Sequence, residues 1–330
     1  MSLRTKEDTQ RAVQDLCNQG WAVTALAVAA ERGLIERLAQ GGTADELAPA
    51  SSLSPRMARA VLDVLVAIGL ARCSEDARYS ASDGLAALLA DGGAPALLAD
   101  LRSTLGQHAQ AQRDARETDS SLEGWRTLDP VIVEAQARLS MGATQAMIAA
   151  MFPRLGVVER LSRKGAAALD VGAGAAGVCI ALCRAFPELR VVGVEPAPEA
   201  LDLARRNVAQ AGLGDRVELR AQGVEDLADD GVFDFVHLAQ MFIPDDAMAR
   251  GARGVYRALA PGGWLVTAAV SAHGTELAQA VSRFRGASWG GGVRFPEDVV
   301  RILREAGFAE PRTVPMGGTL TPIIARRAPE

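Results

Sequence analysis

The second half of the chain alternates between apolar runs of strand length and amphipathic runs of helix length. The apolar runs predict strands over 166–171, 190–194, 217–221, 233–238, 264–270, 309–314 and 320–326. The spacing between them changes to that of helices, clearest over 176–185, 198–211, 245–259 and 296–306. This alternation predicts an α/β domain with a mostly parallel sheet covered by helices on both faces.

The first hundred residues have a helical pattern instead. Apolar residues recur at helical spacing over 21–39, and Thr43 precedes a short helix. Ser54 followed by Pro55 is a favourable start for a further helix, with serine at the N-cap and proline at the first helical position. Two short extended segments follow within 70–80. Helices followed by a small hairpin predict a mostly α-helical winged-helix domain.

Charge argues against two classes of partner. The formal net charge is −5, whereas nucleic acids and anionic membranes attract basic surfaces. Residues 40–105 hold five Arg and no Lys against eight Asp and Glu, so we expect no DNA binding by the winged helix. No apolar run reaches the roughly 18 residues of a membrane span. The N-terminus does not resemble a secretion signal, and we expect a cytoplasmic protein.

The four cysteines predict no metal site. Cys179 and Cys183 are four residues apart in a helical pattern, but no second Cys or His pair at ligand spacing accompanies them. Buried thiols are the simpler interpretation.

The main chemical signal is a glycine-rich turn after the first predicted strand of the α/β domain. That strand ends in Asp170, and Gly172, Gly174 and Gly177 follow before a helix begins. Glycine allows a tight turn and a close approach of backbone to ligand. The next strand ends in Glu195, whose carboxylate can accept hydrogen bonds from both hydroxyls of a ribose. Together these residues predict an adenosine-containing ligand at the carboxyl ends of the strands.

The same glycines fit the G-x-G-x-x-G pattern of NAD- and FAD-binding proteins, which alone is weak evidence. Dehydrogenase chemistry finds little support, because no Tyr-x-x-x-Lys occurs and Lys6 and Lys164 are the only lysines.

The segment ALDVGAGAAG at 168–177 resembles the first motif of class I S-adenosylmethionine-dependent methyltransferases. VFDFVHLAQMF, VYRALAPGGWLV and ILREAGF resemble later segments of that family, and SPRMARAVLDVLVAIGL resembles the dimerisation domain of bacterial small-molecule O-methyltransferases. The resemblance implies a winged-helix dimerisation domain over 1–105, a helical linker and substrate-pocket wall over 106–163, and a Rossmann-like, seven-stranded S-adenosylmethionine-binding domain over 164–330. It also implies a homodimer that methylates a small-molecule acceptor of secondary metabolism.

The resemblance also assigns the cofactor contacts. The glycine turn and its acidic residue would lie beside the methionine part, Glu195 would hold the ribose, Pro196 would lie beside the adenine, and the residues after the fourth strand would approach the sulfonium. The family's usual acidic residue near the adenine is replaced by Gly223, so that side-chain contact is either absent or made by Gln222 or Glu225, and a backbone amide of Val224 or Glu225 can reach the ring instead. The predicted cofactor-binding residues are Asp170, Gly172, Ala173, Gly174, Glu195, Pro196, Gly223, Val224, Glu225, Ala239 and Gln240.

Catalysis is less defined. Methyl transfer from a sulfonium depends on alignment, and a base is needed only if the acceptor must lose a proton. The resembled O-methyltransferases carry a His after the fourth strand, where this chain has QMFIPD over 240–245. His237 and His273 are the remaining candidates for a base, although either can serve as a packing or loop residue.

O-, N- and C-methylation therefore stay open. So does the alternative of a protein with the methyltransferase fold that catalyses a non-methyl reaction or is catalytically silent. The predicted substrate-binding residues are Met141, Met241, Phe242 and Trp289.

Overall fold

The computed structural model describes residues 5–117, 129–270, 275–314 and 320–329. The chain forms two compact units, Met1–Leu105 and Gly106–Glu330. The predicted linker segment, 106–163, is thus part of the second unit. His273, one of the candidate bases, lies outside the described residues.

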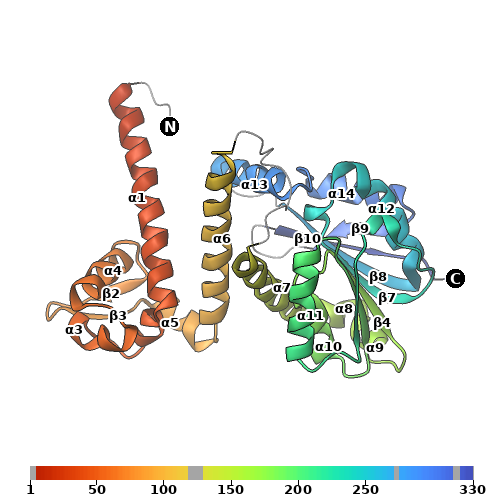
Figure 1. Ribbon diagram of the computed structural model, residues 1–330, viewed down its shortest axis with the longest axis horizontal. Coiled ribbons are helices and arrows are strands. Elements are labelled where there is room, and N and C mark those ends of the chain that lie inside the picture. The colour runs from red at the N-terminus through yellow and green to blue at the C-terminus, as the bar shows by residue number, and fades with distance from the viewer. Residues whose placement is uncertain (1–4, 118–128, 271–274, 315–319, 330) are drawn as a thin grey trace. The chain divides into compact units, whose positions relative to one another are not determined.

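Unit 1 is mostly helical and contains a small antiparallel sheet (Figure 1). Its elements in chain order are α1 (Lys6–Glu31), α2 (Leu34–Arg37), β1 (Gly42–Thr43), α3 (Ala44–Leu47), α4 (Pro55–Ala67), β2 (Ala71–Cys73), β3 (Arg78–Ala81), α5 (Asp83–Ala90) and the start of α6 (Ala94–Asp114). The strands lie in the order β1-β3-β2. Thr43 makes a capping box with Glu46, and the Ser54 hydroxyl accepts a hydrogen bond from Met57 N at 3.2 Å, so both predicted helix starts are present.

Unit 2 contains one seven-stranded sheet in the order β6-β5-β4-β7-β8-β10-β9. The strands are β4 (Ala167–Val171), β5 (Arg190–Val194), β6 (Val217–Arg220), β7 (Phe233–Leu238), β8 (Leu259–Val270), β9 (Ala309–Thr313) and β10 (Leu320–Arg326). The first five are mutually parallel, while β10 runs antiparallel to β8 and β9. The predicted Rossmann-like, seven-stranded α/β fold is confirmed.

Helices cover both faces of this sheet (Figure 1). The helices of unit 2 after α6 are α7 (Pro130–Ala150), α8 (Phe152–Leu155), α9 (Val157–Leu161), α10 (Gly177–Ala185), α11 (Pro198–Gln210), α12 (Asp245–Ala258), α13 (Glu276–Trp289) and α14 (Pro296–Glu305). One apolar core lies between the sheet and α8–α11, and a second lies between the opposite face and α12 and α14. The close packing of these two cores holds the ends of the strands in fixed positions.

Two elements differ from the predicted pattern. Helix α13 was not predicted, because its apolar residues are sparse and several are exposed. Strand β8 begins at Leu259, five residues before the predicted start, since Phe233 pairs with Leu259 and Phe235 with Trp264. The segment Pro-Gly-Gly at 261–263 is therefore an irregularity within the strand.

Among the described residues, no single helix is long and apolar enough to cross a membrane, although the sharply bent pair α5 and α6 passes the same test of length and composition. The described part of the chain also holds no group of three or more His, Cys, Asp or Glu placed for a metal ion.

Candidate functional site

The glycine turn lies where β4 and β5 end side by side. Gly172 has φ +78° and Gly174 φ +51°, both in the left-handed region that favours glycine. The amides of Gly172 and Ala173 each donate to the carbonyl of Val194 at 3.0 Å. The turn is thereby tied to the last residue of β5, next to Glu195.

Glu195 is held by the backbone on both sides. Its Oε2 accepts from Gly174 N at 2.9 Å and its Oε1 from Ala197 N at 3.0 Å. Burial raises the pKa of the Glu195 carboxyl, although the two backbone bonds oppose this shift. Each carboxylate oxygen keeps a second lone pair, so this side chain is a fixed acceptor of further hydrogen bonds.

Asp170 is turned away from solvent, with its side chain only 1% exposed. One oxygen lies 2.8 Å from Nδ1 of His237 on the neighbouring strand β7, and the other accepts from the Cys179 thiol at 3.4 Å. Burial, followed by the charge of Asp170, raises the pKa of Cys179 well above its ordinary value, so this thiol is unreactive.

His237 is the polar group of this pair that reaches solvent, with 24% of its side chain exposed. A carboxylate at Nδ1 fixes the orientation of an imidazole. The structure thus brings together Asp170 and His237, which lie far apart in the sequence, and leaves His237 as the more exposed of the two.

The residues that follow β7 lie against the glycine turn. Ala239 N donates to the carbonyl of Val171 at 3.0 Å. A Cβ added to Gly172 would lie 3.1 Å from the Cβ of Ala239, which is tighter than ordinary contact. The post-β7 segment (residues 239–243) therefore packs beside the glycine turn at the carboxyl end of the sheet.

Arg294, which the sequence analysis did not identify, holds this segment. Its guanidinium is 6% exposed and donates from Nη1 to Gln240 O at 2.9 Å and Gln240 Oε1 at 3.1 Å. Its Nη2 donates to Ile243 O at 2.9 Å and to Asp245 Oδ1 at 2.5 Å. Gln240 in turn donates to Ala268 O of β8 at 2.8 Å. Burial lowers the pKa of Arg294, and Asp245 opposes that shift.

Two of the predicted substrate-binding residues, Phe242 and Trp289, contact each other beside the post-β7 segment. The rings of Phe242 and Trp289 lie 5.3 Å apart, and Trp289 Nε1 donates to Gln107 at 2.9 Å. A Cβ on Gly291 would lie 1.8 Å from the carbonyl oxygen of Met241, so the backbones of the α13–α14 connection and the post-β7 segment are in direct contact. Met241 itself is half-buried.

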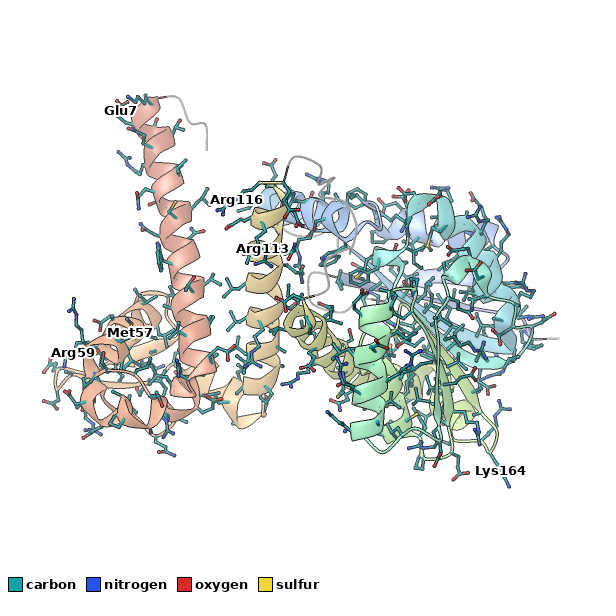
Figure 2. All side chains as sticks on the ribbon, in the orientation of Figure 1. Glu7, Met57, Arg59, Arg113, Arg116 and Lys164 are labelled. Carbon is teal, nitrogen blue, oxygen red and sulfur yellow. The ribbon has the colours of Figure 1, made fainter. Side chains whose placement is uncertain are left out.

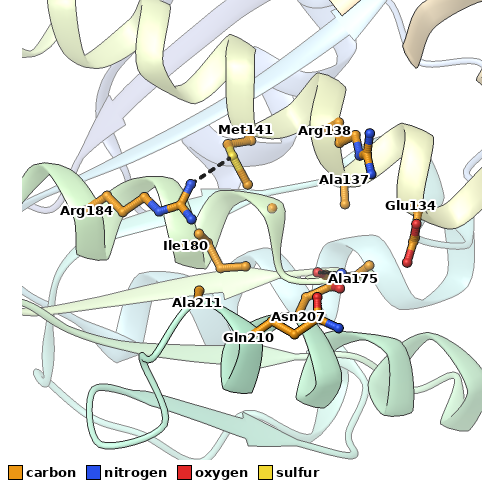
Figure 3. A pocket seen from close by; sticks show the side chains of 11 residues that line it. Glu134, Ala137, Arg138, Met141, Ala175, Ile180, Arg184, Asn207, Gln210 and Ala211 are labelled. Atoms are coloured by element: carbon orange, nitrogen blue, oxygen red, sulfur yellow. Dashed lines mark hydrogen bonds between the residues drawn. The ribbon is translucent and has the colours of Figure 1, made fainter. Parts of the chain in front are cut away.

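Met141 lies away from these residues. It lines a trough of about 470 Å³ between α7, α10 and α11, where Arg184 Nη1 lies 3.8 Å from its sulfur (Figure 3).

The remaining predicted cofactor residues differ in exposure. Val224 is buried against Gly251 of α12, whereas Pro196 and Glu225 are exposed.

Helix α7 packs closely against the first residue of α10. A Cβ on Gly177 would lie 2.0 Å from the carbonyl oxygen of Ala137. Glycine is therefore needed at this position for the close approach of the two backbones.

Comparison with known proteins agrees with the predicted methyltransferase domain. Residues 168–263 match the family described as "Methyltransferase domain". Release factor glutamine methyltransferase of Agrobacterium fabrum is 32% identical over 108 residues, covering 32% of this chain and 36% of that protein. The enzyme of the same name from Geobacter sulfurreducens is 35% identical over 91 residues, covering 27% and 31%. These matches span about a third of the length of the curated relatives.

Solved structures are similar over nearly the whole chain. Mitomycin 7-O-methyltransferase has a TM-score of 0.65 at 24% identity, covering 98% of this chain and 99% of that one. Human N-acetylserotonin methyltransferase, solved with S-adenosylmethionine, has a TM-score of 0.65 at 18% identity, covering 99% and 100%. Residues 168–263 therefore match a methyltransferase domain, and the predicted fold, a seven-stranded methyltransferase-like domain preceded by a helical domain, is confirmed. These matches do not favour the alternative of a protein with this fold that catalyses a non-methyl reaction or is catalytically silent.

Proposed function

We propose that this chain binds S-adenosylmethionine at the carboxyl ends of β4, β5 and β7 and transfers its methyl group to a small-molecule acceptor. The observation that carries the proposal is Glu195, a half-buried carboxylate oriented by two backbone amides beside two left-handed glycines. The match of residues 168–263 to the methyltransferase domain family favours this cofactor over NAD or FAD.

The residues present fit the cofactor. The Glu195 carboxylate would accept the two ribose hydroxyls. The glycine turn gives backbone access to the methionine part, and His237 rather than the enclosed Asp170 offers a side chain there. Pro196 and Glu225, which are exposed, would lie near the adenine. The cofactor supplies a methyl group on a sulfonium, which is already activated toward displacement.

The protein's part is then alignment. The post-β7 segment, supported by Arg294 and covered by Trp289, would orient the acceptor and exclude water. For an acceptor that must lose a proton, His237 is the candidate base among the described residues, because Asp170 orients its ring. His273 stays a prediction.

Turnover tests this function. The protein would be incubated with S-adenosylmethionine and a panel containing 4-nitrocatechol, an aromatic amine and a 1,3-diketone, and release of S-adenosylhomocysteine measured by mass spectrometry. We expect at least one acceptor class to give product that carries one additional methyl group. Cofactor binding without methylated product from any class of acceptor would contradict small-molecule methylation.

We also propose that the chain forms a homodimer through unit 1. Helix α1 extends beyond the rest of unit 1 (Figure 1), and Figure 2 shows Glu7 at its free end. Only Ala29 and Ala30 of this helix are buried, while Val13, Leu16 and Trp21 are 55%, 59% and 74% exposed. Exposed apolar residues on the N-terminal part of α1 suit contact with a second copy of the same helix.

Light scattering tests the dimer. We expect wild-type protein to be dimeric at micromolar concentration and Leu16→Glu to be monomeric, whereas the control Gln14→Glu stays dimeric. A monomeric wild type would contradict the proposal. Cytoplasmic location and the lack of a nucleic-acid partner stay predictions.

A further inference from the structure

A group of arginines lies at the amino end of the sheet, opposite the proposed cofactor site. Arg160 comes from α9, Arg163 from the turn before β4, and Arg326 from the end of β10. They surround Gly262, in the irregular part of β8, and line a pocket of about 340 Å³ together with Trp264. Figure 2 shows the neighbouring Lys164 at the same end of unit 2.

The enclosed negative charge beside these arginines is the carboxylate of Asp234, which already has partners. Asp234 accepts from Arg163 Nη2 at 2.7 Å and from Ala167 N at 3.2 Å, and its Oδ1 lies 2.9 Å from Arg160 Nε. The contact with Arg160 Nε lacks hydrogen-bond geometry and leaves this buried donor unsatisfied. Glu159 also lines the pocket, but its side chain is exposed. The one enclosed carboxylate thus contacts two of the three guanidinium groups, those of Arg160 and Arg163, and none is paired with Arg326 among the described residues.

The consequence is electrostatic strain among the cations. Burial lowers the pKa of Arg160, Asp234 opposes that shift, and the positive charges of Arg163 and Arg326 lower the pKa further. Arg326 is also held in place, because its Nε donates to Gly262 O at 3.2 Å and its guanidinium lies 5.4 Å from the centre of the Trp264 ring. It cannot swing away into solvent without losing both contacts.

Two free donors converge at the centre of this group. A point at the Cβ position of Gly262 lies 3.2 Å from Arg160 Nη1 and 3.3 Å from Arg326 Nη2. No described residue accepts a hydrogen bond from either nitrogen. Gly262 has φ +71° and no side chain, so nothing of its own fills the space in front of them.

We propose that Arg160 and Arg326, with Arg163 beside them, form a binding site for a phosphate group at the amino end of the sheet. Guanidinium groups present several donors in fixed planes and pair with oxyanions through more than one hydrogen bond. A phosphate dianion supplies three acceptor oxygens and the charge that Asp234 leaves unbalanced. Free phosphate and the phosphate of a small metabolite share this chemistry.

Calorimetric titration of the full chain with inorganic phosphate, at ionic strength matched with chloride, tests the site. We expect saturable binding to the wild type, about tenfold weaker binding to Arg326→Met, and at most a twofold change in the control Arg312→Met, an exposed arginine on the adjacent strand β9. Glu195→Gln is also expected to bind phosphate normally, because the two sites lie at opposite ends of the sheet.

Ribose 5-phosphate distinguishes the source of the ligand. Binding tighter than that of inorganic phosphate would indicate a phosphorylated metabolite, and equal binding would indicate the free ion. The wild type decides the proposal even if Arg326→Met does not fold. Absence of saturable phosphate binding, or binding that Arg326→Met leaves unchanged, would overturn it.

Discussion

The two halves of the proposed site at the carboxyl end of the sheet are built differently. The cofactor half (β4, β5 and the glycine turn) is made mainly by backbone groups of one β4-α10-β5 unit, with Glu195 bonded to Gly174 and Ala197. The acceptor half (the post-β7 segment with Arg294 and Trp289) is made by side chains some fifty residues apart, since Arg294 bonds to Gln240 and Ile243. A common cofactor is thus bound by a local motif, and the wall facing a variable acceptor is held by long-range contacts that can change independently.

Arg294→Met is expected to have the largest effect on stability. It removes the contacts that hold the acceptor half and leaves those of the cofactor half unchanged. It leaves the carbonyls of Gln240 and Ile243 without their donor, and we expect unfolding to become easier by about 3 kcal/mol. The control is Arg301→Met, an exposed arginine on α14, with a change within about 0.5 kcal/mol. Chemical denaturation measures both.

Arg294→Met also tests whether the acceptor half and the cofactor half act separately in methyl transfer. We expect kcat for methyl transfer to fall at least tenfold in Arg294→Met, while the Kd for S-adenosylhomocysteine changes less than about threefold. An equal loss in both quantities would show that Arg294 supports the cofactor half as well.

Glu195→Gln breaks the cofactor half. It removes the charge and sets a side-chain amide against a backbone amide, so we expect S-adenosylmethionine to bind about 30-fold more weakly, or by about 2 kcal/mol. Glu188→Gln is a matched control, because Glu188 precedes the amino end of the same strand and is exposed. Calorimetry on both variants is the check, and equal affinities would remove Glu195 from the site.

Acidification should weaken cofactor binding through the same residue. Burial raises the pKa of Glu195, and the ionised form is the one that accepts ribose hydroxyls. Affinity is therefore full above this raised pKa and falls as the pH drops through it, by at most about tenfold per pH unit. Titrations over a pH series measure the loss, and Glu195→Gln should lack this step.

Asp245→Asn is expected to have the smallest effect. Asp245 pairs with Arg294, but its side chain is 75% exposed and the other bonds of Arg294 remain. We expect a loss of stability below about 1 kcal/mol. A loss as large as that of Arg294→Met would mean that the ion pair, and not the bonds to backbone carbonyls, holds the post-β7 segment.

The same contrast explains what could be predicted from the sequence. Strand periodicity, the glycine turn and Glu195 are local signals, and the seven strands follow from them. Arg294 is one of many arginines in the chain, and its importance depends on contacts with residues 240–245 that no spacing rule encodes. The pairing of Asp170 with His237 is likewise set by the neighbouring positions of β4 and β7 in the sheet. Helix α13 has an exposed, weakly apolar surface and so gave little periodic signal.

The most direct test of the account is calorimetric titration of the wild-type chain with S-adenosylmethionine, S-adenosylhomocysteine and NAD. The geometry of Glu195 and the match to the methyltransferase domain family predict micromolar binding of the first two and none of NAD. Binding of NAD, or of none of the three, would contradict the assignment of an S-adenosylmethionine site at the carboxyl ends of β4, β5 and β7.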